Sequence, residues 1–259
     1  MAKFATAQEV IEMASEGITP RYPVFGFDLH ISASNSKLGK IWNFSKLAGN
    51  GIQLDGNGVP ITNILGSCPF NCEGCYACAS QALCRPSVIR NWAENTSLSR
   101  SGWFEDYLRG WFESHPAKDS EKRLFRINQS GEIEDVRELR VWAHIAENAG
   151  FYAGYEFAIY TKRFDIVREF MNGNGWNLPF NLQINLSECE GYPAPADLKA
   201  FFPCFVWDTG QPEAANLPHC PAVLKPVDGR KKGARNKGMT CAQCRRCYRS
   251  NATTAVFNH

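Results

Sequence analysis

Short apolar runs alternate with amphipathic stretches over most of the chain, which predicts strands separated by helices. The predicted strands cover residues 61–65, 123–128, 155–160 and 180–186, with weaker candidates at 202–207 and 222–224. Apolar residues recur at helical spacing at Val136, Leu139, Ala143 and Ala146, again at Phe164, Val167 and Phe170, and within residues 101–113. The helix that begins near Phe164 is expected to stop at Gly173, because glycine readily adopts the left-handed conformation that follows a helix.

The chain before residue 61 has a different pattern. Thr6 and Glu9 have the spacing of a capping box and Gly17 follows, so we predict a helix over residues 6–16. The other expectations for this part are two β-rich stretches at 24–31 and 40–46 and a glycine-containing loop at 48–60.

The alternation of strands and helices implies parallel strands joined by crossover helices. Six strands fit an open doubly wound sheet as well as an incomplete barrel. Cysteines and other polar residues follow the ends of successive predicted strands. Barrel enzymes place their catalytic residues at these strand ends, so this placement favours the barrel. We therefore expect an α/β fold with a partial (βα)6 TIM-like barrel over 61–224. An N-terminal helix and β extension (1–60) precedes it, and a basic, cysteine-rich tail (225–259) follows.

Composition narrows the class of protein. The chain has 259 residues, 44% of them hydrophobic and 21% charged, with a net charge of +2, as in ordinary globular proteins. No apolar run approaches the roughly 18 residues of a membrane helix, and the N-terminus lacks the apolar core of a secretory signal, so we expect a cytoplasmic protein. Eleven cysteines, mostly in two groups, favour metal binding over disulfides in a reducing compartment.

The first cysteine group has the spacing C-x3-C-x2-C at Cys68, Cys72 and Cys75. Three thiolates in one loop can hold three corners of a [4Fe–4S] cluster and leave one iron open to another ligand. The alternative is a zinc knuckle in which Cys78 or Cys84 supplies the fourth ligand.

At these residues the chain resembles the radical S-adenosylmethionine (SAM) superfamily, whose members carry C-x3-C-x2-C after the first barrel strand. Ser130-Gly131-Glu132 resembles the Gly-Gly-Glu motif of that superfamily, which implies contact with the methionine amino group of SAM. The resemblance also implies that Tyr76, Thr161, Lys162 and Asn185 contribute to cofactor binding. A plainer reading of Glu132 is a carboxylate favoured by a helix N-terminus.

A narrower resemblance is to the phage-encoded "gene product 88" domain family. It rests on Cys75-Tyr76-Ala77, residues 127–132, Ile159-Tyr160-Thr161-Lys162 and the cysteine-rich end. This resemblance implies a fold, a cofactor and the cytosol of a bacterial host, but no substrate.

The second cysteine group is Cys241-x2-Cys244-x2-Cys247, which has ferredoxin-like spacing, and Cys220 can complete it as a fourth ligand. Four thiolates make a closed site that suits electron transfer or structure. The alternative to a second [4Fe–4S] cluster is zinc, held with His219 or Cys220.

The chain's main charge asymmetry surrounds this second group. Its basic residues are Lys225, Arg230, Lys231, Lys232, Arg235, Lys237, Arg245, Arg246 and Arg249, and the only acidic residue among them is Asp228. Such a run can follow a phosphate backbone, so nucleic acid is a candidate partner. The alternatives are cations that balance an anionic cluster and a merely solvated run.

Two functions follow as hypotheses. The first is a radical SAM-type enzyme that uses an external electron donor to cleave SAM to a 5′-deoxyadenosyl radical, which acts on an unknown substrate such as a nucleic acid or nucleotide. The second is a non-catalytic iron–sulfur protein that binds nucleic acid or has an accessory or structural role. Cys189 follows a predicted strand and is a candidate catalytic residue, although a buried spectator cysteine is the plainer interpretation.

Overall fold

The computed structural model describes residues 3–33, 38–70, 72, 75–83, 85–117, 123–188, 191–208, 216–221, 223–224, 234–235, 239–249 and 254–257. The chain divides into two compact units, each built from separate stretches of sequence. The cysteine-loop unit comprises Met1–Ile31, Phe44–Ser114 and Asn128–Trp142. The sheet unit comprises Ser32–Asn43, His115–Ile127 and Ala143–His259.

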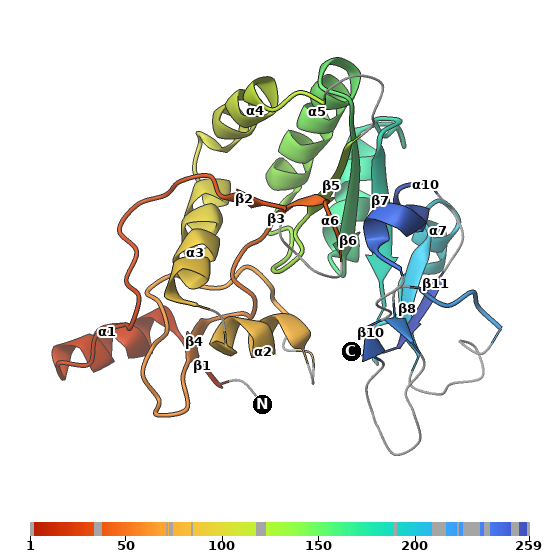
Figure 1. The fold of residues 1–259 in the computed structure, drawn as a ribbon. Helices are drawn as coiled ribbons and strands as arrows, with labels where there is room; N and C mark the ends of the chain where they lie inside the picture. Colours follow the sequence, from red (N-terminus) through yellow and green to blue (C-terminus); the bar gives the residue numbers. More distant parts are fainter. Residues whose placement is uncertain are drawn as a thin grey trace. The chain divides into compact units, whose positions relative to one another are not determined.

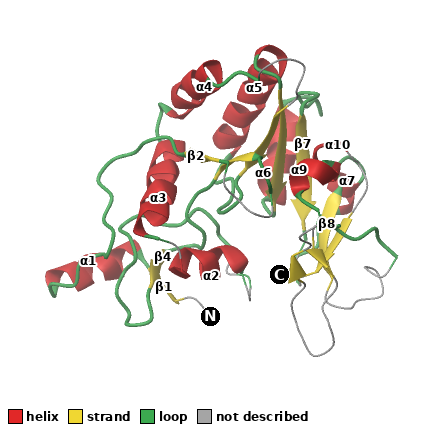
Figure 2. Cartoon of the chain, in the orientation of Figure 1, coloured by secondary structure: helices red, strands yellow, loops and turns green. Residues whose placement is uncertain are grey.

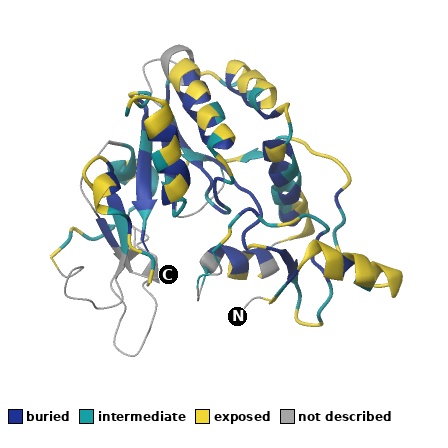
Figure 3. Cartoon of the chain, turned by 180° about the vertical axis from the view of Figure 1, so that it is seen from behind, coloured by how far each residue is buried: buried dark blue, intermediate teal, exposed yellow. Residues whose placement is uncertain are grey.

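The cysteine-loop unit begins with a short antiparallel pair, β1 (Lys3–Ala5) and β4 (Ile52–Leu54). Helix α1 (Ala7–Ser15) follows β1, and most of its residues are exposed (Figure 3). The predicted capping box is present, since the Thr6 hydroxyl accepts the Glu9 N–H and the Glu9 carboxylate accepts the Thr6 N–H. The first predicted helix is therefore confirmed. Strand β4, however, lies inside the segment predicted to be a loop.

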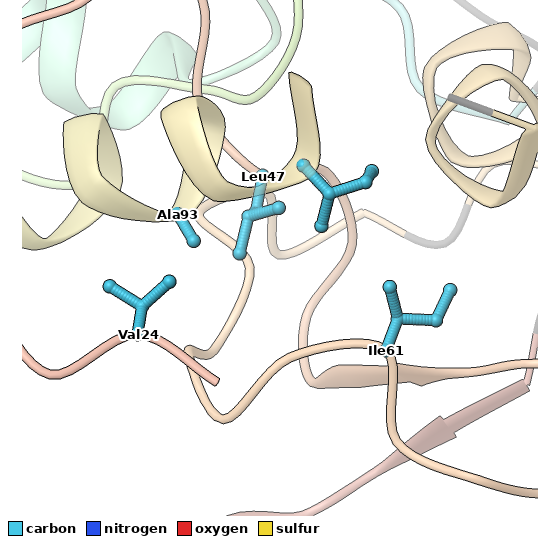
Figure 4. Packing of buried hydrophobic residues seen from close by; sticks show 5 residues of the cluster. Val24, Leu47, Ile61 and Ala93 are labelled. Atoms are coloured by element: carbon cyan, nitrogen blue, oxygen red, sulfur yellow. The ribbon is translucent and has the colours of Figure 1, made fainter. Parts of the chain in front are cut away.

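Three more helices belong to this unit: α2 (Tyr76–Leu83), α3 (Pro86–Arg100) and α4 (Phe104–Ser114). Helix α3 starts with Pro86, which suits the first turn because proline has no N–H to leave unpaired. An apolar cluster joins α3 to three loop segments through Val24, Leu47, Ile61, Ile89 and Ala93 (Figure 4).

The prediction of a strand at 61–65 is wrong. The Ile61 N–H donates to the Gln53 carbonyl, and the Ile61 carbonyl accepts the Tyr22 N–H. The Thr62 hydroxyl then closes a turn by accepting the Ile64 N–H. The apolar residues of this segment therefore pack against α3 instead of pairing in the main sheet.

Over the residues that the structure describes, the main sheet has seven strands in the order β11-β8-β7-β6-β5-β3-β2 (Figures 1 and 2). They are β2 (Ile31–Ser32), β3 (Trp42–Phe44), β5 (Arg123–Ile127), β6 (Tyr155–Thr161), β7 (Leu182–Ser187), β8 (Cys204–Asp208) and β11 (Thr254–Phe257). Apart from the end residues Ile31 and Phe44, all their residues belong to the sheet unit. Every pairing from β3 to β11 is parallel.

Helices connect successive central strands: α5 (Val136–Tyr152) follows β5, α6 (Phe164–Gly173) follows β6 and α7 (Ala196–Lys199) follows β7. The central strands are buried and largely apolar, as parallel strands require. The predicted mixed α/β fold with a parallel sheet is confirmed. The strand order is linear, and no described strands close it into a barrel.

The chain's last third adds two features to the sheet unit. The predicted strand near 222–224 appears as β9 (Val223–Leu224), which pairs antiparallel with β10 (Ala234–Arg235) in a separate ladder. Two one-turn helices, α9 (Cys241–Cys244) and α10 (Arg246–Arg249), follow, and α10 packs against β6 and β7 (Figure 1). Within the described stretches, no helix is long and apolar enough to span a bilayer.

Candidate metal and cofactor site

Backbone hydrogen bonds fix the start of the first cysteine loop. Gly66 N–H donates to the Gly51 carbonyl at 3.0 Å, Ser67 N–H to the Leu47 carbonyl at 2.9 Å and Cys68 N–H to the Gly49 carbonyl at 3.0 Å. A Cβ at Gly66 would lie only 2.3 Å from the Gly49 carbonyl oxygen, so this close approach requires glycine. The position of Cys68 is therefore set by the main chain.

The end of the loop runs into a helix. Cys75 N–H donates to the Cys72 carbonyl, and the Cys75 carbonyl accepts the Ala79 N–H in the first turn of α2. Cys68, Cys72 and Cys75 are half-buried and form no disulfide, and Cys78 on α2 is buried. A helix N-terminus favours a nearby thiolate, so the loop suits metal ligation.

The thiols of this group interact with one another. Cys78 and Cys75 share a side-chain hydrogen bond, and Cys68 and Cys72 lie within electrostatic range of Cys78. The hydrogen bond to Cys75 raises the pKa of Cys78, and burial and the neighbouring cysteine charges raise it further. As they stand, no three His, Cys, Asp or Glu side chains in the described part of the chain form a group that could hold a metal ion. The donor chemistry fits a thiophilic metal or cluster, and ligation requires the sulfur atoms to draw closer together.

The Ser130-Gly131-Glu132 turn lies beside the start of this loop. The Ser67 hydroxyl accepts the Glu132 N–H at 3.1 Å and donates to the Leu47 carbonyl at 2.9 Å. Gly131 has φ +82°, and a Cβ there would lie 2.5 Å from the Ser67 Oγ. Only glycine fits this turn, both because of its positive φ and because of that contact. The structure thus brings together the loop and the turn that the sequence singled out.

Polar atoms without partners gather on the same segment. The side-chain amide of Asn128 (3% exposed) and the hydroxyl of Ser130 (4% exposed) have no hydrogen-bond partner among the described residues. Asn128 also has φ +48°, an uncommon backbone conformation outside glycine. Each unsatisfied buried group costs about 1–3 kcal/mol, so these atoms are what a bound polar ligand would satisfy.

A buried ion-pair network supports the turn. Lys46 is fully buried, and its Nζ lies 2.7 Å from both carboxylate oxygens of Glu138 and 3.4 Å from Glu134. Glu134 is paired with Arg100, which also donates to the carbonyls of Leu65 and Gly66 just before the cysteine loop. Burial raises the pKa of Glu138, and Lys46 opposes that rise. The Lys46 N–H also donates to the Ser130 carbonyl, so this network joins the two halves of the site.

The second cysteine group lies in the sheet unit. Helix α9 begins with a capping box of Thr240 and Gln243, which presents Cys241 and Cys244 one turn apart. Arg245 then adopts a left-handed conformation and α10 carries Cys247. The thiols of Cys220 and Cys241 lie within electrostatic range of Cys247.

The surroundings of Cys247 are closely packed. Burial raises the pKa of Cys247 to about 11, although a hydrogen bond with Tyr160 and the charge of Arg126 oppose that rise. The Arg126 guanidinium lies 3.4 Å from the centroid of the Tyr160 ring. The Asn185 amide donates to the carbonyls of Ile159 and Cys247, which fastens α10 to the sheet.

Comparison with known proteins gives one match. The family model for gene product 88 matches residues 30–250, most of the chain. The chain belongs to the gene product 88 family. No curated protein and no solved structure matches it. The narrower resemblance found in the sequence is thereby confirmed, and with it the indication of a bacteriophage origin.

For this gene product 88 chain, the remaining predicted cofactor residues belong to the sheet unit. Thr161 is buried at the end of β6, and its hydroxyl accepts the Arg163 N–H at 2.9 Å. Lys162 follows in the same turn. The amide nitrogen of Asn185 is used within the sheet unit, so its local role is to anchor the segment that carries Cys247.

Several predicted residues cannot be placed. Cys84, Cys189 and most of the basic run lie outside the described residues, as does the side chain of Tyr76. Of the basic side chains only those of Arg245 and Arg246 are described, and Arg245 donates to the Ala242 carbonyl.

Sequence reasoning missed Ser67, Lys46 and Tyr160 as parts of the two sites. Ser67 had a signal, because it directly precedes the first cysteine. Lys46 acts through contacts between segments far apart in sequence, for which the chain carries no local signal. Tyr160 lies in a segment quoted for the resemblance, and what sequence reasoning missed is its contact with Cys247.

Proposed function

We propose that the chain is an iron–sulfur protein of the radical SAM type, in which Cys68, Cys72 and Cys75 hold a [4Fe–4S] cluster. The observation that carries the proposal is the hydrogen bond from Glu132 N–H to the Ser67 hydroxyl. It joins the cysteine loop to a glycine turn whose neighbouring residues, Asn128 and Ser130, hold buried polar atoms without partners. A metal-binding loop beside unsatisfied polar atoms suits a cofactor that bridges the two.

The residues of the turn would contact polar groups of the methionine part of SAM. Ser130, Gly131 and the buried carboxylate of Glu132 would hold the methionine amino group, a cation that pairs with a carboxylate. Asn128 and Ser130 would donate to and accept from the amino-acid end of SAM. A cluster held by the three cysteines would supply one electron from an external donor for the reductive cleavage of SAM to methionine and a 5′-deoxyadenosyl radical. Tyr76 remains a proposed cofactor contact by resemblance, and Cys189 a proposed catalytic residue.

The remaining proposals concern the strands, the second metal site, the electron donor and the substrate. We take β5–β8 as the counterpart of the partial-barrel strands in that superfamily. Cys220, Cys241, Cys244 and Cys247 would hold a second [4Fe–4S] cluster or zinc. An external donor would supply electrons in the cytoplasm of the bacterial host. A nucleic acid or nucleotide is the proposed substrate class, because of the basic run over residues 225–249.

The test is anaerobic reconstitution followed by iron and sulfide counting, EPR of the reduced protein with and without SAM, and detection of 5′-deoxyadenosine. We expect iron, a SAM-dependent EPR change and the nucleoside. Cys72→Ala should lose both the SAM response and part of the iron. Cys204→Ala, which removes a buried cysteine outside both groups, should retain them. Zinc without iron would refute the proposal.

A second candidate is a non-catalytic iron–sulfur protein that binds nucleic acid. It is favoured by Cys78, which lies beside the first three cysteines and can close the site that catalysis needs open. Iron without any SAM-dependent EPR change would select this candidate.

A further inference from the structure

Helix α2 presents a fourth cysteine to the first cysteine group. Cys78 lies one helical turn after Cys75, a spacing of C-x2-C across the start of the helix. The two thiols share a hydrogen bond, and Cys68 and Cys72 lie within electrostatic range. The full spacing is thus C-x3-C-x2-C-x2-C, whose last part is typical of four-thiolate iron–sulfur and zinc sites.

The position of Cys78 is held from two sides. Its carbonyl accepts a hydrogen bond from the Gln53 side chain at 3.1 Å, and the Gln81 side chain on the same helix accepts the Ala48 N–H at 2.9 Å. Cys78 is 4% exposed and packs with Ala48 and Ala77, with Cys75 against the same cluster. These contacts fix the helical turn that carries Cys78 and keep it packed beside Cys75.

We propose that Cys78 is the fourth thiolate of the first metal site, and that it closes the site until a cofactor displaces it. The proposal deepens the proposed function and rests on it for the metal at Cys68, Cys72 and Cys75. Cys75 and Cys78 already touch, so ligation mainly draws Cys68 and Cys72 inward. When the Cys78 sulfur binds the metal, its thiol proton is released to solvent.

A displaceable fourth ligand has a chemical consequence. A cluster with four cysteines resists the oxidative loss of an iron, whereas a cluster with three loses its open iron readily. A cofactor that binds the fourth iron must compete with Cys78, so its apparent affinity is lowered by the fraction of sites that are closed.

The test uses Co²⁺ as the probe, since it reports thiolate ligands without needing a cluster. The reduced full-length chain is titrated anaerobically, and thiolate-to-cobalt charge-transfer absorption is compared among wild type, Cys78→Ala, Cys72→Ala and Cys204→Ala. Alanine suits position 78 because a buried cysteine packs as a small apolar residue. Circular dichroism before titration verifies that each variant is folded.

We expect Cys78→Ala and Cys72→Ala to lose equal absorption, about a quarter of that from a four-thiolate site, and Cys204→Ala to lose none. The inference fails if Cys78→Ala keeps the wild-type absorption, whether or not Cys72→Ala loses some. Because the probe is cobalt and not iron, the experiment distinguishes failure of this inference from failure of the proposed function. Four thiolates on cobalt at the first cysteine group with no iron uptake at that group would sink the proposed function alone. Iron uptake at the first group with an unchanged Cys78→Ala spectrum would sink this inference alone.

The iron-loaded protein gives a second measurement. After mild oxidation, Cys78→Ala should show a stronger [3Fe–4S] EPR signal than wild type and Cys204→Ala. Equal signals in all three would overturn the inference.

Discussion

The two cysteine groups have similar spacing and different surroundings. In the cysteine-loop unit, the thiols lie beside a glycine turn with unsatisfied polar atoms at Asn128 and Ser130. In the sheet unit, the Cys247 thiol shares a hydrogen bond with Tyr160, and the Asn185 amide donates to the Cys247 carbonyl. Two groups of similar spacing therefore differ in what surrounds them: buried polar atoms without partners lie beside the first, whereas the thiol of Cys247 in the second already bonds to protein groups.

The buried contacts that hold the two cysteine groups in place differ as well. The cysteine-loop unit uses a buried ion pair, Lys46–Glu138, and the sheet unit uses aromatic and apolar packing around Tyr160. A buried charge without its partner is far costlier than a lost apolar contact. Variants of the first support should therefore have the largest effects.

Lys46→Met should destabilise the protein by about 3–5 kcal/mol, because it leaves the Glu138 carboxylate buried and unpaired. Urea unfolding measures the loss. The double variant Lys46→Met/Glu138→Gln should recover much of it, since glutamine still accepts the Glu134 N–H that Glu138 accepts at 2.9 Å. Arg168→Met removes an ion pair with Asp197 in which both side chains are about half exposed, and it should cost far less.

The stability loss of Lys46→Met should depend on pH. Burial raises the pKa of Glu138 above its unfolded value, so proton binding favours the folded state. The loss in Lys46→Met should therefore shrink as the pH falls toward the ordinary glutamate pKa of about 4.3. A loss independent of pH would mean that no unpaired carboxylate is left behind.

Gly131→Ala should cost about 1–3 kcal/mol and weaken SAM binding while metal at the second cysteine group is retained. The matched control is Gly17→Ala, which has a similar φ of +84° but nothing within 4 Å of the added Cβ. The difference between the two variants isolates the contact with Ser67 and Lys46. Equal losses of stability, with SAM binding unchanged, would separate the turn from the cofactor site.

Tyr160→Phe should cost about 0.5–1.5 kcal/mol through loss of the hydrogen bond to Cys247. It should speed metal loss from the second group and leave the first unchanged, as followed by chelator competition. Tyr107→Phe, at a partly exposed ring in the cysteine-loop unit, should do neither. Metal lost equally from both groups would contradict the separation drawn here.

Ser130→Ala should be the least destabilising of these variants and should leave stability unchanged or slightly raised, because it removes a buried hydroxyl that has no partner to lose. It should nonetheless weaken SAM binding severalfold by calorimetry. Ser99→Ala, which removes an equally buried hydroxyl that donates to the Thr96 carbonyl, should cost about 1 kcal/mol. If Ser130→Ala destabilises the free protein as much as Ser99→Ala, the Ser130 hydroxyl already has a hydrogen-bond partner in the free protein and is not left for a ligand.

Local patterns were enough to predict part of the fold. The capping box at Thr6 and Glu9 gave α1, and strong apolar runs gave β5, β6 and β7. The apolar run at 61–65 misled because its residues pack on α3, and periodicity does not distinguish a packed loop from a strand. Strand β11 was missed because its pairing with β8 joins residues about fifty positions apart.

The candidate site, like the fold, could be predicted only in part from the sequence. Cysteine spacing identified both groups, and resemblance identified the Ser130-Gly131-Glu132 turn. The link through Ser67, the support by Lys46 and the closeness of Cys78 depend on how α2 and the loops pack. Such contacts between distant segments carry no periodic signal in one sequence.

The most direct test of the central claim is electron–nuclear double resonance on the reduced, reconstituted protein with SAM carrying ¹⁵N in its amino group. If the cysteine loop and the glycine turn form one site, the spectrum should show ¹⁵N coupled to the cluster, and Cys72→Ala should abolish that coupling. A cluster that forms fully but shows no coupling to the labelled nitrogen would contradict the account.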